Sequence, residues 1–409
     1  MARFDVSRRV FLKGASVAAV GVGLQPSSLL VRAAEAAGPG TGVLVKVFLR
    51  GGCDGLNLCV PYVDPTYYSI RGVIAIPQPG QPGGVLNLNG AFGLHPNLGA
   101  LKPLYDQGRV AFVPAVGNYG LTRSHFDAQD FMESGTPGDK TTGTGWLDRA
   151  MVAVPGSEIT QTVAFSSQLP RALLGPEPVL VASNLSSFNL RASNWSGEAG
   201  ALLRALYRND SGVVARVGQD TFTAIDVLQR SPAIQAPPAN GAVYPNASVG
   251  SSLRQAAQVI KGQLGTRCIF VNVGGAFDTH SGQLAAQATE FQRLGDALAA
   301  FATDLGNLMD DVVVLVTTEF GRSAYVNGSA GTDHGSAHCA IVMGNRVRGR
   351  NVLGPWPGLA PNLLYQQRDL AVGTDFRDLF SELAVGVLGV PAAGLFPGYT
   401  PTSNLGILL

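Results

Sequence analysis

The sequence predicts an α/β fold built on a mostly parallel sheet that helices cover on both faces. Apolar runs without polar interruptions recur along the chain, which is typical of strands buried on both faces. Helical patterns lie between these runs, and such an alternation indicates an α/β architecture. Hydrophobic residues make up 46% of the chain and charged residues 14%, so a large core is possible. The predicted strands are Val43–Leu49, Val110–Pro114, Cys268–Val273, Val312–Thr317 and Cys339–Met343.

The length of the chain limits the number of domains, and its net charge limits the kind of ligand. We interpret the 409 residues as a signal segment at 1–36 and a single domain at 37–409. The formal net charge is +1 and no arginine-rich segment stands out, so the sequence lacks the basic footprint of a nucleic-acid-binding protein. Residues 165–260 are hard to assign, and we expect a cap or an insertion beside the sheet there.

The N-terminal segment has the pattern of an export signal. Arg8 and Arg9 stand in "SRRVFLKG", a mildly apolar stretch follows, and Ala34-Glu35-Ala36 offers a cleavage site. Paired arginines in this context resemble a twin-arginine signal, with an ordinary secretory signal as the alternative. We therefore expect the twin-arginine translocase as a partner during export and a periplasmic or secreted mature protein. No second long apolar run follows, so we do not expect the mature protein to be membrane-embedded.

One long helix and the state of the cysteines can be predicted directly. Apolar residues recur at spacings of three and four between Gln283 and Leu308, which predicts a helix packed on the sheet. His95, in "GLHPNLGAL", is expected at the start of another helix. The four cysteines form no CxxC pair, so a zinc–thiolate site is not expected, and buried unpaired thiols are.

Polar residues of unusual type adjoin the predicted strands. Because ligands bind beyond the carboxyl ends of strands in open α/β sheets, we expect these side chains to share one edge. The pairs Gly51-Gly52 and Gly274-Gly275 allow tight turns and a close approach of backbone N–H groups to an anion. The residues concerned are Asp54 after the first strand, Arg123, Ser124 and His125 after the second, Asp278 and His280 after the third, Glu319 and Arg322 after the fourth, and Asp333, His334 and His338 just before the fifth.

Each motif also has a plain structural interpretation. Asp54 beside a glycine is typical of a turn. The Asp-Thr-His motif could belong to a helix cap, since Thr279 or Ser281 is a suitable first residue for the long helix. Glu319 and Arg322 could form a local ion pair. The gathering of four such sites at one expected edge favours a metal or active site over these alternatives.

Carboxylates mixed with imidazoles suit Zn, Mn, Mg or Fe, so we predict one or two divalent metal ions. Two ions would clamp the attacking and leaving oxygens of an in-line displacement, and Arg123 or Arg322 would hold the remaining oxygens. Ser124 is the best-placed hydroxyl for a nucleophile. Ser124 could instead be the N-cap of a helix, because Ser124 and Asp127 are spaced to begin one. This chemistry is the hydrolysis of a phosphate or sulfate ester.

Several stretches resemble, in order, the signatures of the bacterial DUF1501 family. They are "FLRGGCDGLN", "RSHFDAQDFMESG", "GGAFDTHSGQ", "EFGRS" and "DHGSAH", with "GLHPNLGAL" and "GPWPGL" in agreement. The resemblance extends from about Val43 to the C-terminus. That family is usually placed in the alkaline phosphatase and sulfatase superfamily, so the resemblance implies a doubly wound sheet with metal ligands at the strand ends. By motif order it implies Asp54, Asp278, His280 and His334 as metal ligands, Glu319 in the place of a metal aspartate, and Ser124 near the nucleophile.

Two departures from the superfamily pattern limit the residue roles that the resemblance implies. Glu319-Phe320 stands where the superfamily often has Asp-His, so one imidazole ligand is missing there. His125, Asp333 and His338 are the candidates to replace it, unless the second metal is absent. The stretch "CVPYV" lacks the arginine of the sulfatase motif, so formylglycine chemistry is not expected.

We therefore predict an exported metal-dependent hydrolase that acts on a small anionic ester or a polysaccharide. The alternative is a non-catalytic exported binding or cell-surface assembly protein that keeps the fold. The predicted metal ligands are Asp54, Asp278, His280, Glu319, Asp333 and His334, and the predicted catalytic residues are Ser124, Arg123, Arg322 and His125.

Overall fold

The structure is a computed structural model that describes residues 41–409, apart from 121, 157, 186–187, 189–195 and 209–211. The expected signal at 1–36 lies outside the described residues. The described part of the chain belongs to one compact unit, Gly40–Leu409. Within this part, no helix is both long enough and apolar enough to cross a membrane.

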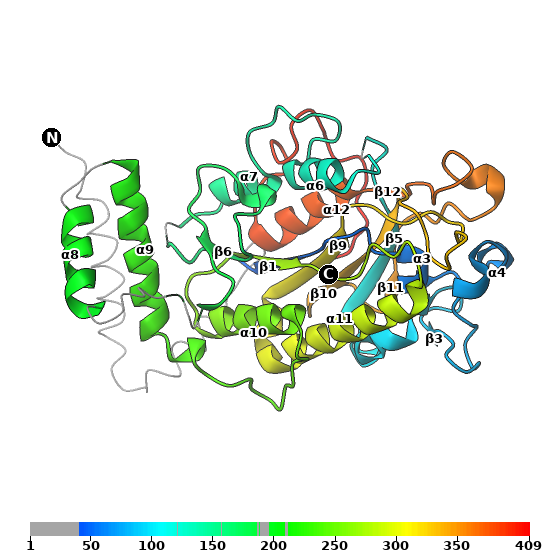
Figure 1. The fold of residues 1–409 in the computed structure, drawn as a ribbon, viewed down its shortest axis with the longest axis horizontal. Helices are drawn as coiled ribbons and strands as arrows, with labels where there is room; N and C mark the ends of the chain where they lie inside the picture. The colour runs from blue at the N-terminus through cyan, green and yellow to red at the C-terminus, as the bar shows by residue number, and fades with distance from the viewer. Residues whose placement is uncertain (1–40, 121, 157, 186–187, 189–195, 209–211) are drawn as a thin grey trace. The chain divides into compact units, whose positions relative to one another are not determined.

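A nine-stranded, mostly parallel sheet forms the centre of this unit (Figure 1). β1 (Val43–Leu49) lies between β8 (Cys268–Val273) and β9 (Val312–Thr318), and the three are parallel. β10 (His338–Met343) runs antiparallel to β9 and to β5 (Val110–Gly117). The order is β11-β5-β10-β9-β1-β8-β6-β7, with β12 paired to β5. The predicted fold class is confirmed, with β10 reversed.

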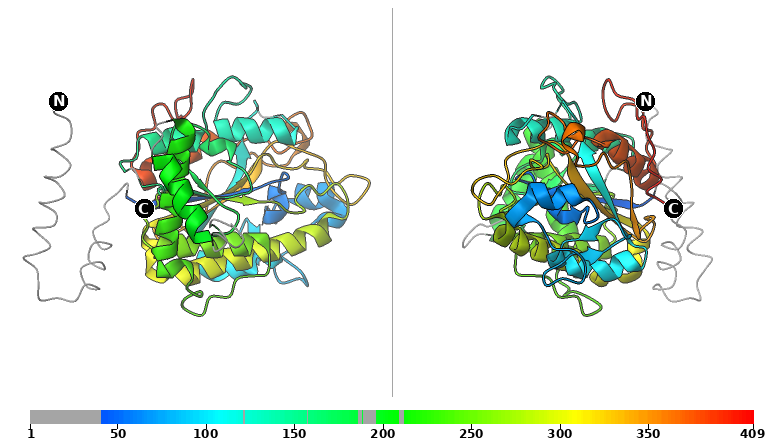
Figure 2. Two further views of the ribbon diagram at one scale, coloured as in Figure 1. Left: turned by 60° about the vertical axis from the view of Figure 1, so that its left-hand side comes forward. Right: turned by 90° about the vertical axis from the view of Figure 1, so that its right-hand side faces the viewer.

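Helices cover both faces of this sheet, as the views in Figure 2 show. Side chains alternate along the central strand, so Val45 belongs to the core on one face and Leu44 to the core on the other. This alternation between two buried faces explains why the strands read as uninterrupted apolar runs. The helices on the Val45 face are α10 (Ser248–Lys261) and α11 (Gln283–Leu305), and those on the Leu44 face are α7 (Trp146–Val152) and α12 (Phe376–Leu383).

The predicted long helix is present as α11 and begins at Gln283 as expected, but its capping residue and its C-terminal end differ from expectation. It follows Gly282, whose φ is 54°, and neither Thr279 nor Ser281 caps it. It ends at Leu305, because Gly306 adopts a φ of 53° and a 3-10 turn, η6 (Gly306–Asp310), follows. All four cysteines are free and buried, as predicted.

The middle region, 165–260, is more closely integrated than a separate cap. β6 (Thr162–Phe165) and β7 (Leu180–Val181) extend the sheet at one edge. The region also contains two helices, α8 (Ser196–Arg208) and α9 (Val213–Arg230). The Pro-rich stretch after α9 includes η5 (Pro232–Ile234) and leads to α10, which the sequence did not reveal.

The remaining elements are short. A small second sheet has the order β2-β4-β3. His95 caps η2 as expected at a helix start, with its Nδ1 accepting from the backbone of Asn97. The elements are α3 (Gly55–Leu58), β2 (Cys59–Val60), α4 (Pro65–Arg71), η1 (Gly72–Ile74), β3 (Leu86–Asn87), β4 (Gly93–Leu94), η2 (Pro96–Leu101), α5 (Lys102–Asp106), α6 (His125–Ser134), η3 (Arg171–Leu173), β11 (Asn351–Val352), η7 (Pro361–Leu363), β12 (Thr374–Asp375) and the π-helical η8 (Ala384–Leu388).

Candidate metal centre

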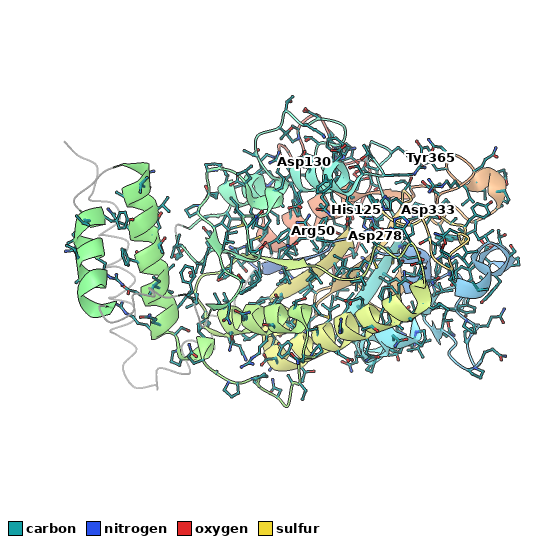
Figure 3. All side chains as sticks on the ribbon, in the orientation of Figure 1. Arg50, His125, Asp130, Asp278, Asp333 and Tyr365 are labelled. Carbon is teal, nitrogen blue, oxygen red and sulfur yellow. The ribbon has the colours of Figure 1, made fainter. Side chains whose placement is uncertain are left out.

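The predicted edge of the sheet exists and gathers most of the predicted residues. β1, β8 and β9 end on the same edge because they are parallel, and the reversed β10 begins there. The loop after β8 therefore brings Asp278 next to His125, which opens α6, and next to the loop that precedes β10 (Figure 3). Because β10 is antiparallel to its neighbours, the loop that precedes β10 lies at the same edge as the loops that follow β1, β8 and β9.

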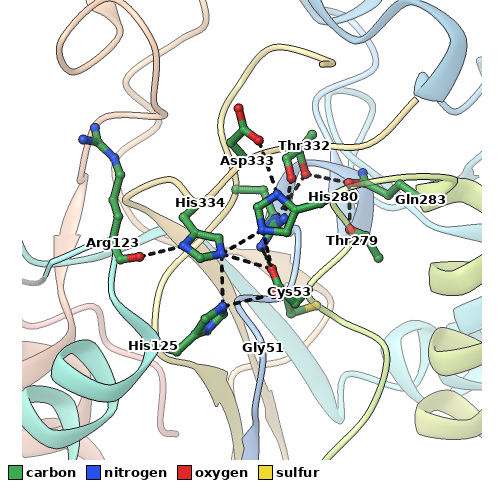
Figure 4. Close-up of polar contacts among 12 residues, drawn as sticks. Gly51, Cys53, Arg123, His125, Thr279, His280, Gln283, Thr332, Asp333 and His334 are labelled. Carbon is green, nitrogen blue, oxygen red and sulfur yellow. Dashed lines mark hydrogen bonds and ion pairs between the residues drawn. The ribbon is translucent and has the colours of Figure 1, made fainter. Parts of the chain in front are cut away.

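Three side chains converge most tightly: His125, Asp278 and His334. One nitrogen or oxygen atom from each lies within 4.8 Å of the others. The Nε2 atoms of His125 and His334 are 3.1 Å apart, and the Asp278 carboxylate lies 3.3 Å from the first and 3.1 Å from the second. His280 joins from the side, with its Nε2 3.0 Å from His334 Nε2 and 3.0 Å from Asp278 (Figure 4). We call these four residues the histidine cluster.

The opposite ring nitrogen of each histidine faces a hydrogen-bond acceptor. His125 Nδ1 lies 2.8 Å from the Glu319 carboxylate, and His334 Nδ1 lies 2.6 Å from the carbonyl oxygen of Arg123. His280 Nδ1 lies 3.3 Å from the Asp333 carboxylate. A carbonyl or an ionised carboxylate only accepts, so the tautomer that satisfies these three contacts carries its proton on Nδ1. In the neutral rings, the three Nε2 atoms are therefore left with lone pairs.

Lone pairs that face one another at about 3 Å repel, and the cluster needs a cation between them. Ligands bound to a tetrahedral Zn²⁺ at 2.0–2.1 Å lie roughly 3.3 Å apart, close to the separations found here. Histidines that bind a metal also donate the other ring N–H to a carboxylate or a backbone carbonyl, as all three do. The donor set and its surroundings therefore fit a divalent metal ion.

The charge state of the rings follows their contacts. The hydrogen bond to Glu319 raises the pKa of His125. Burial lowers the pKa of His334, although its bond to the Arg123 carbonyl opposes this. One ring thus accepts a proton more readily than the other in the absence of a metal, and a proton is the simplest cation that the cluster can hold.

Glu319 lies on the buried side of the cluster, where it contacts His125 Nδ1, and it is not one of the four cluster residues. Its side chain is fully buried, and its carboxylate accepts from His125, from Gln129 at 2.9 Å, from the backbone N–H of Gly51 at 2.9 Å and from Thr318. Burial acts to raise the pKa of Glu319, but these hydrogen bonds outweigh it and bring the pKa to about 2. The anion expected at the Gly51-Gly52 turn is therefore a carboxylate of the protein itself.

Arg322 holds Asp278 in the same way. Its buried guanidinium donates to Asp278 Oδ1 at 2.6 Å and also binds the side chain and carbonyl of Thr332. Burial acts to raise the pKa of Asp278, yet the bond and the charge of Arg322 leave that pKa below its usual value. Arg322 is thus committed to a protein carboxylate and is not free to bind the oxygens of a substrate.

Among the described contacts, none joins the side chain of Asp54, Arg123 or Ser124 to the cluster. Asp54 is buried as the N-cap of α3 and accepts from Leu56, Arg71 and Gln283, which agrees with the turn interpretation. Arg123 contributes its carbonyl, while its guanidinium turns away to Asp369 (Figure 4). Ser124 precedes α6 with an exposed side chain, makes no side-chain cap bond, and among the described contacts none joins it to the cluster.

Of the three candidates to replace the imidazole that is absent at Glu319-Phe320, His125 has its ring in the cluster. The ring of Phe320 is buried beneath the cluster, with its centroid 4.8 Å from that of His125 and 5.0 Å from that of His334. His338, the other imidazole considered, is fully buried in β10 and lies outside the cluster. Asp333 takes a supporting position against His280.

Sequence reasoning missed Gln129, Thr332 and Gln283. Gln129 stands four residues after His125 on α6, so the helical repeat places both on one face toward Glu319. Gln283 donates to Asp54 and accepts from Thr332 at 2.6 Å, which links the Asp54 turn to the base of the cluster. The α6 repeat was a readable signal, whereas the Gln283 contacts depend on the tertiary fold.

A family model matches residues 43–386, and its description is "Protein of unknown function (DUF1501)". The chain belongs to this family. The resemblance predicted from the ordered motifs is confirmed. No curated protein matches this DUF1501 chain.

Solved structures of the alkaline phosphatase and sulfatase class resemble the DUF1501 chain weakly. A protein in the alkaline phosphatase superfamily from Vibrio parahaemolyticus is 10% identical over 77% of this chain, with a TM-score of 0.32, and the match spans 64% of that protein. The PsFucS1 sulfatase from Pseudoalteromonas sp. is 12% identical over 93% of this chain and 75% of its own, with a TM-score of 0.37. The C-terminal periplasmic domain of EcEptC from Escherichia coli, in complex with Zn, is 10% identical over 76% and 74%, with a TM-score of 0.34. No residue role is transferred from them.

Proposed function

We propose that the chain is a divalent-metal-dependent hydrolase of phosphate or sulfate esters. One observation carries this proposal. The Nε2 atoms of three histidines meet the Asp278 carboxylate at 3.0–3.3 Å, while an acceptor fixes the opposite nitrogen of each ring. A structural histidine seldom leaves its free lone pair facing another lone pair, so the arrangement is best explained by a metal ion.

His125, His334 and Asp278 would hold the ion, and His280 stands ready as a fourth ligand or as part of a second site. Two or three nitrogen ligands with one carboxylate suit Zn or Mn better than Mg, which prefers oxygen. When bound, such an ion supplies a Lewis acid that polarises an ester oxygen and lowers the pKa of water.

The protein groups around the cluster do the work of orientation. Glu319 fixes the ring of His125, and Arg322 fixes the carboxylate of Asp278, so both ligands are set before a substrate arrives. The side chains of Asp278 and His280 are 42% and 47% exposed, which leaves one side of the cluster open to an anionic ester. Side chains that are fixed on the buried side and open to solvent on the other suit a hydrolytic site.

The attacking oxygen comes from Ser124 or from water. Ser124 directly precedes His125 and its side chain is exposed, so it is the candidate hydroxyl nearest in sequence to the cluster. Ser124→Ala decides between the two. Turnover that survives this change assigns the attack to water, and turnover that disappears in a protein with unchanged metal content assigns it to Ser124.

Metal content and turnover test the proposal together. Protein produced with its own signal should contain about one or two transition-metal ions per chain. It should turn over at least one of the aryl phosphate monoesters, aryl phosphate diesters and aryl sulfates, and Asp278→Ala should reduce that turnover more than 100-fold. Asp296→Ala, on the exposed surface of α11, is the matched control. A folded protein that binds neither Zn nor Mn excludes the hydrolase, and metal without turnover favours the non-catalytic binding protein.

We also propose export through the twin-arginine pathway, because Arg8 and Arg9 stand in "SRRVFLKG" before a mildly apolar stretch and the Ala34-Glu35-Ala36 cleavage site. Cell fractionation tests this directly. Replacement of both arginines by lysine should retain the protein in the cytoplasm, while replacement of Lys13 by arginine should leave export unchanged.

A further inference from the structure

Two loops border the histidine cluster and are both tied to His334. The loop after β5 contributes the carbonyl of Arg123, which accepts from His334 Nδ1 at 2.6 Å. The segment 365–369 contributes Arg368, whose Nη2 donates to the carbonyl of His334 at 2.9 Å. Anything bound at the cluster therefore lies beside these loops.

Two partly exposed arginines lie along this border. Arg123 donates twice to Asp369 Oδ2, at 2.9 and 2.5 Å, and Arg368 lies 3.8 Å from Asp369 Oδ1. The Asp369 side chain is fully buried, whereas the two arginine side chains are 35% and 36% exposed. Two guanidinium groups share this buried carboxylate, and N–H groups of both arginines remain toward solvent. Burial acts to raise the pKa of the exposed Asp333 carboxylate, but its bond to His280 and the nearby charge of Arg368 lower that pKa. Guanidinium binds phosphate, sulfate and carboxylate groups through paired hydrogen bonds.

A strained turn holds this arrangement. Gln366 and Gln367 both have a φ of 54°, and the N–H of Arg368 bonds back to the carbonyl of Tyr365 at 3.1 Å. Positive φ at both central residues is the pattern of a type I′ turn, which strongly favours Asn and Gly over residues such as Gln. The Gln366 side chain accepts from Arg123 Nη2 at 2.8 Å, so the unfavourable residue serves to fix the arginine.

An aromatic pair lies next to the arginines. The rings of Tyr119 and Tyr365 have centroids 4.5 Å apart at an interplanar angle of 36°. Tyr119 is 50% exposed, and its hydroxyl accepts from the backbone of Val372, which fixes the ring. An aromatic side chain that is half exposed presents apolar surface beside polar groups, which suits a ring that also carries hydroxyl groups. We call Tyr119, Arg123, Tyr365 and Arg368 the Arg–Tyr rim (Tyr365 is labelled in Figure 3).

We propose that the Arg–Tyr rim binds the non-reacting part of the substrate, and that this part is a sugar ring with an anionic group of its own. The tyrosine platform would contact the C–H face of the ring, and the exposed N–H groups of Arg123 and Arg368 would bind the anion. This inference rests on the proposed hydrolase function, which it deepens by naming the substrate class. The scissile ester would lie toward the histidine cluster.

Isothermal titration calorimetry on the full, metal-free chain tests the rim separately from catalysis. The probes are glucose 6-phosphate, glucose, inorganic phosphate and adenosine 5′-monophosphate. We expect glucose 6-phosphate to bind at least tenfold more tightly than the other three. Arg368→Gln and Tyr119→Ala should each weaken its binding at least tenfold, whereas Arg293→Gln, at an exposed ion pair on α11, should leave it unchanged. Because Tyr119 is half exposed, its alanine variant keeps the test valid if Arg368→Gln does not fold.

The other outcomes overturn the proposal. These are undetectable binding of glucose 6-phosphate, binding that neither variant weakens, tighter binding of adenosine 5′-monophosphate, and binding that requires added Zn. The last would place the anion on the metal instead of the rim. Failure of the proposed function is distinguishable, because a chain that binds no metal but binds glucose 6-phosphate through the rim loses only the hydrolase proposal.

Discussion

The Nδ1 atom of His125 lies 2.8 Å from the buried carboxylate of Glu319, across 194 residues of sequence. The sequence predicts Glu319 as a metal ligand and His125 as a catalytic residue, whereas in the structure the His125 ring lies in the cluster and the Glu319 carboxylate lies behind that ring. His125 turns its Nε2 toward His334 and Asp278, and Glu319 stays beneath and fixes the ring. The same arrangement recurs with Asp333 behind His280. Carboxylates in this protein therefore orient imidazoles as much as they serve as ligands.

Glu319→Gln should lower the affinity for Zn about 10–100-fold, the usual effect of losing a carboxylate that orients a metal-binding histidine. The amide keeps the size of the side chain but removes the charge that holds His125 Nδ1–H, Gln129 and the Gly51 N–H together. The dissociation constant for Zn can be measured by competition with a chromogenic chelator. Glu290→Gln, on α11, is the matched control. An affinity within threefold of the wild type would show that His125 is not held through Glu319.

Asp54→Ala should destabilise the fold without loss of metal. The change leaves the fully buried guanidinium of Arg71 without its carboxylate, and breaking such a pair costs about 3–5 kcal/mol. Urea unfolding measures the loss, and Asp54→Ala combined with Arg71→Met should recover part of it. Metal content per folded chain should stay the same. A folded Asp54→Ala protein that has lost its metal would return Asp54 to the metal centre.

The contrast between Asp54 and Asp278 shows which features of the candidate site could be predicted from the sequence. Both follow an apolar strand and a glycine pair, so the shared edge was predictable from strand patterns and the end of each strand. The direction of each carboxylate depends on a distant cation, Arg71 for the first and Arg322 for the second, and no local pattern contains that information. The left-handed Gly282 before α11 was not predicted because Thr279 and Ser281 are the more usual capping residues, whereas the break between α8 and α9 coincides with Gly212, a poor helix former that directly precedes α9.

Gly52→Ala should disturb the histidine cluster through Phe320. Gly52 has a φ of 66°, and a Cβ atom there would lie 2.4 Å from Phe320 Cε2, so the ring that underlies His125 and His334 must move. We expect a loss of about 1–3 kcal/mol in unfolding free energy, and a weaker affinity for Zn. Gly80→Ala separates the two causes, because Gly80 also has a positive φ, 85°, but has open space around it. Equal effects of both variants on Zn affinity would show that Phe320 does not support the cluster.

Lys46→Met should stabilise the protein, and the gain should depend on pH. Lys46 lies in the central strand with 1% of its surface exposed, donates to Thr317 and faces the ring of Phe380 at 4.6 Å. Burial lowers its pKa well below the usual value, which the charge of Glu133 only partly offsets. The unfolded chain therefore binds a proton that the folded chain releases, and stability rises with pH between the folded and the unfolded pKa of the lysine.

Removing a buried ionic group in favour of an apolar one of similar volume commonly gains up to about 1–4 kcal/mol. Urea unfolding at pH 7 should show this gain, and it should shrink as pH rises toward about 10.4, the pKa of a free lysine. A loss of stability at pH 7, or a difference that does not change with pH, would mean that the hydrogen bond to Thr317 and the Phe380 contact outweigh the cost of burial.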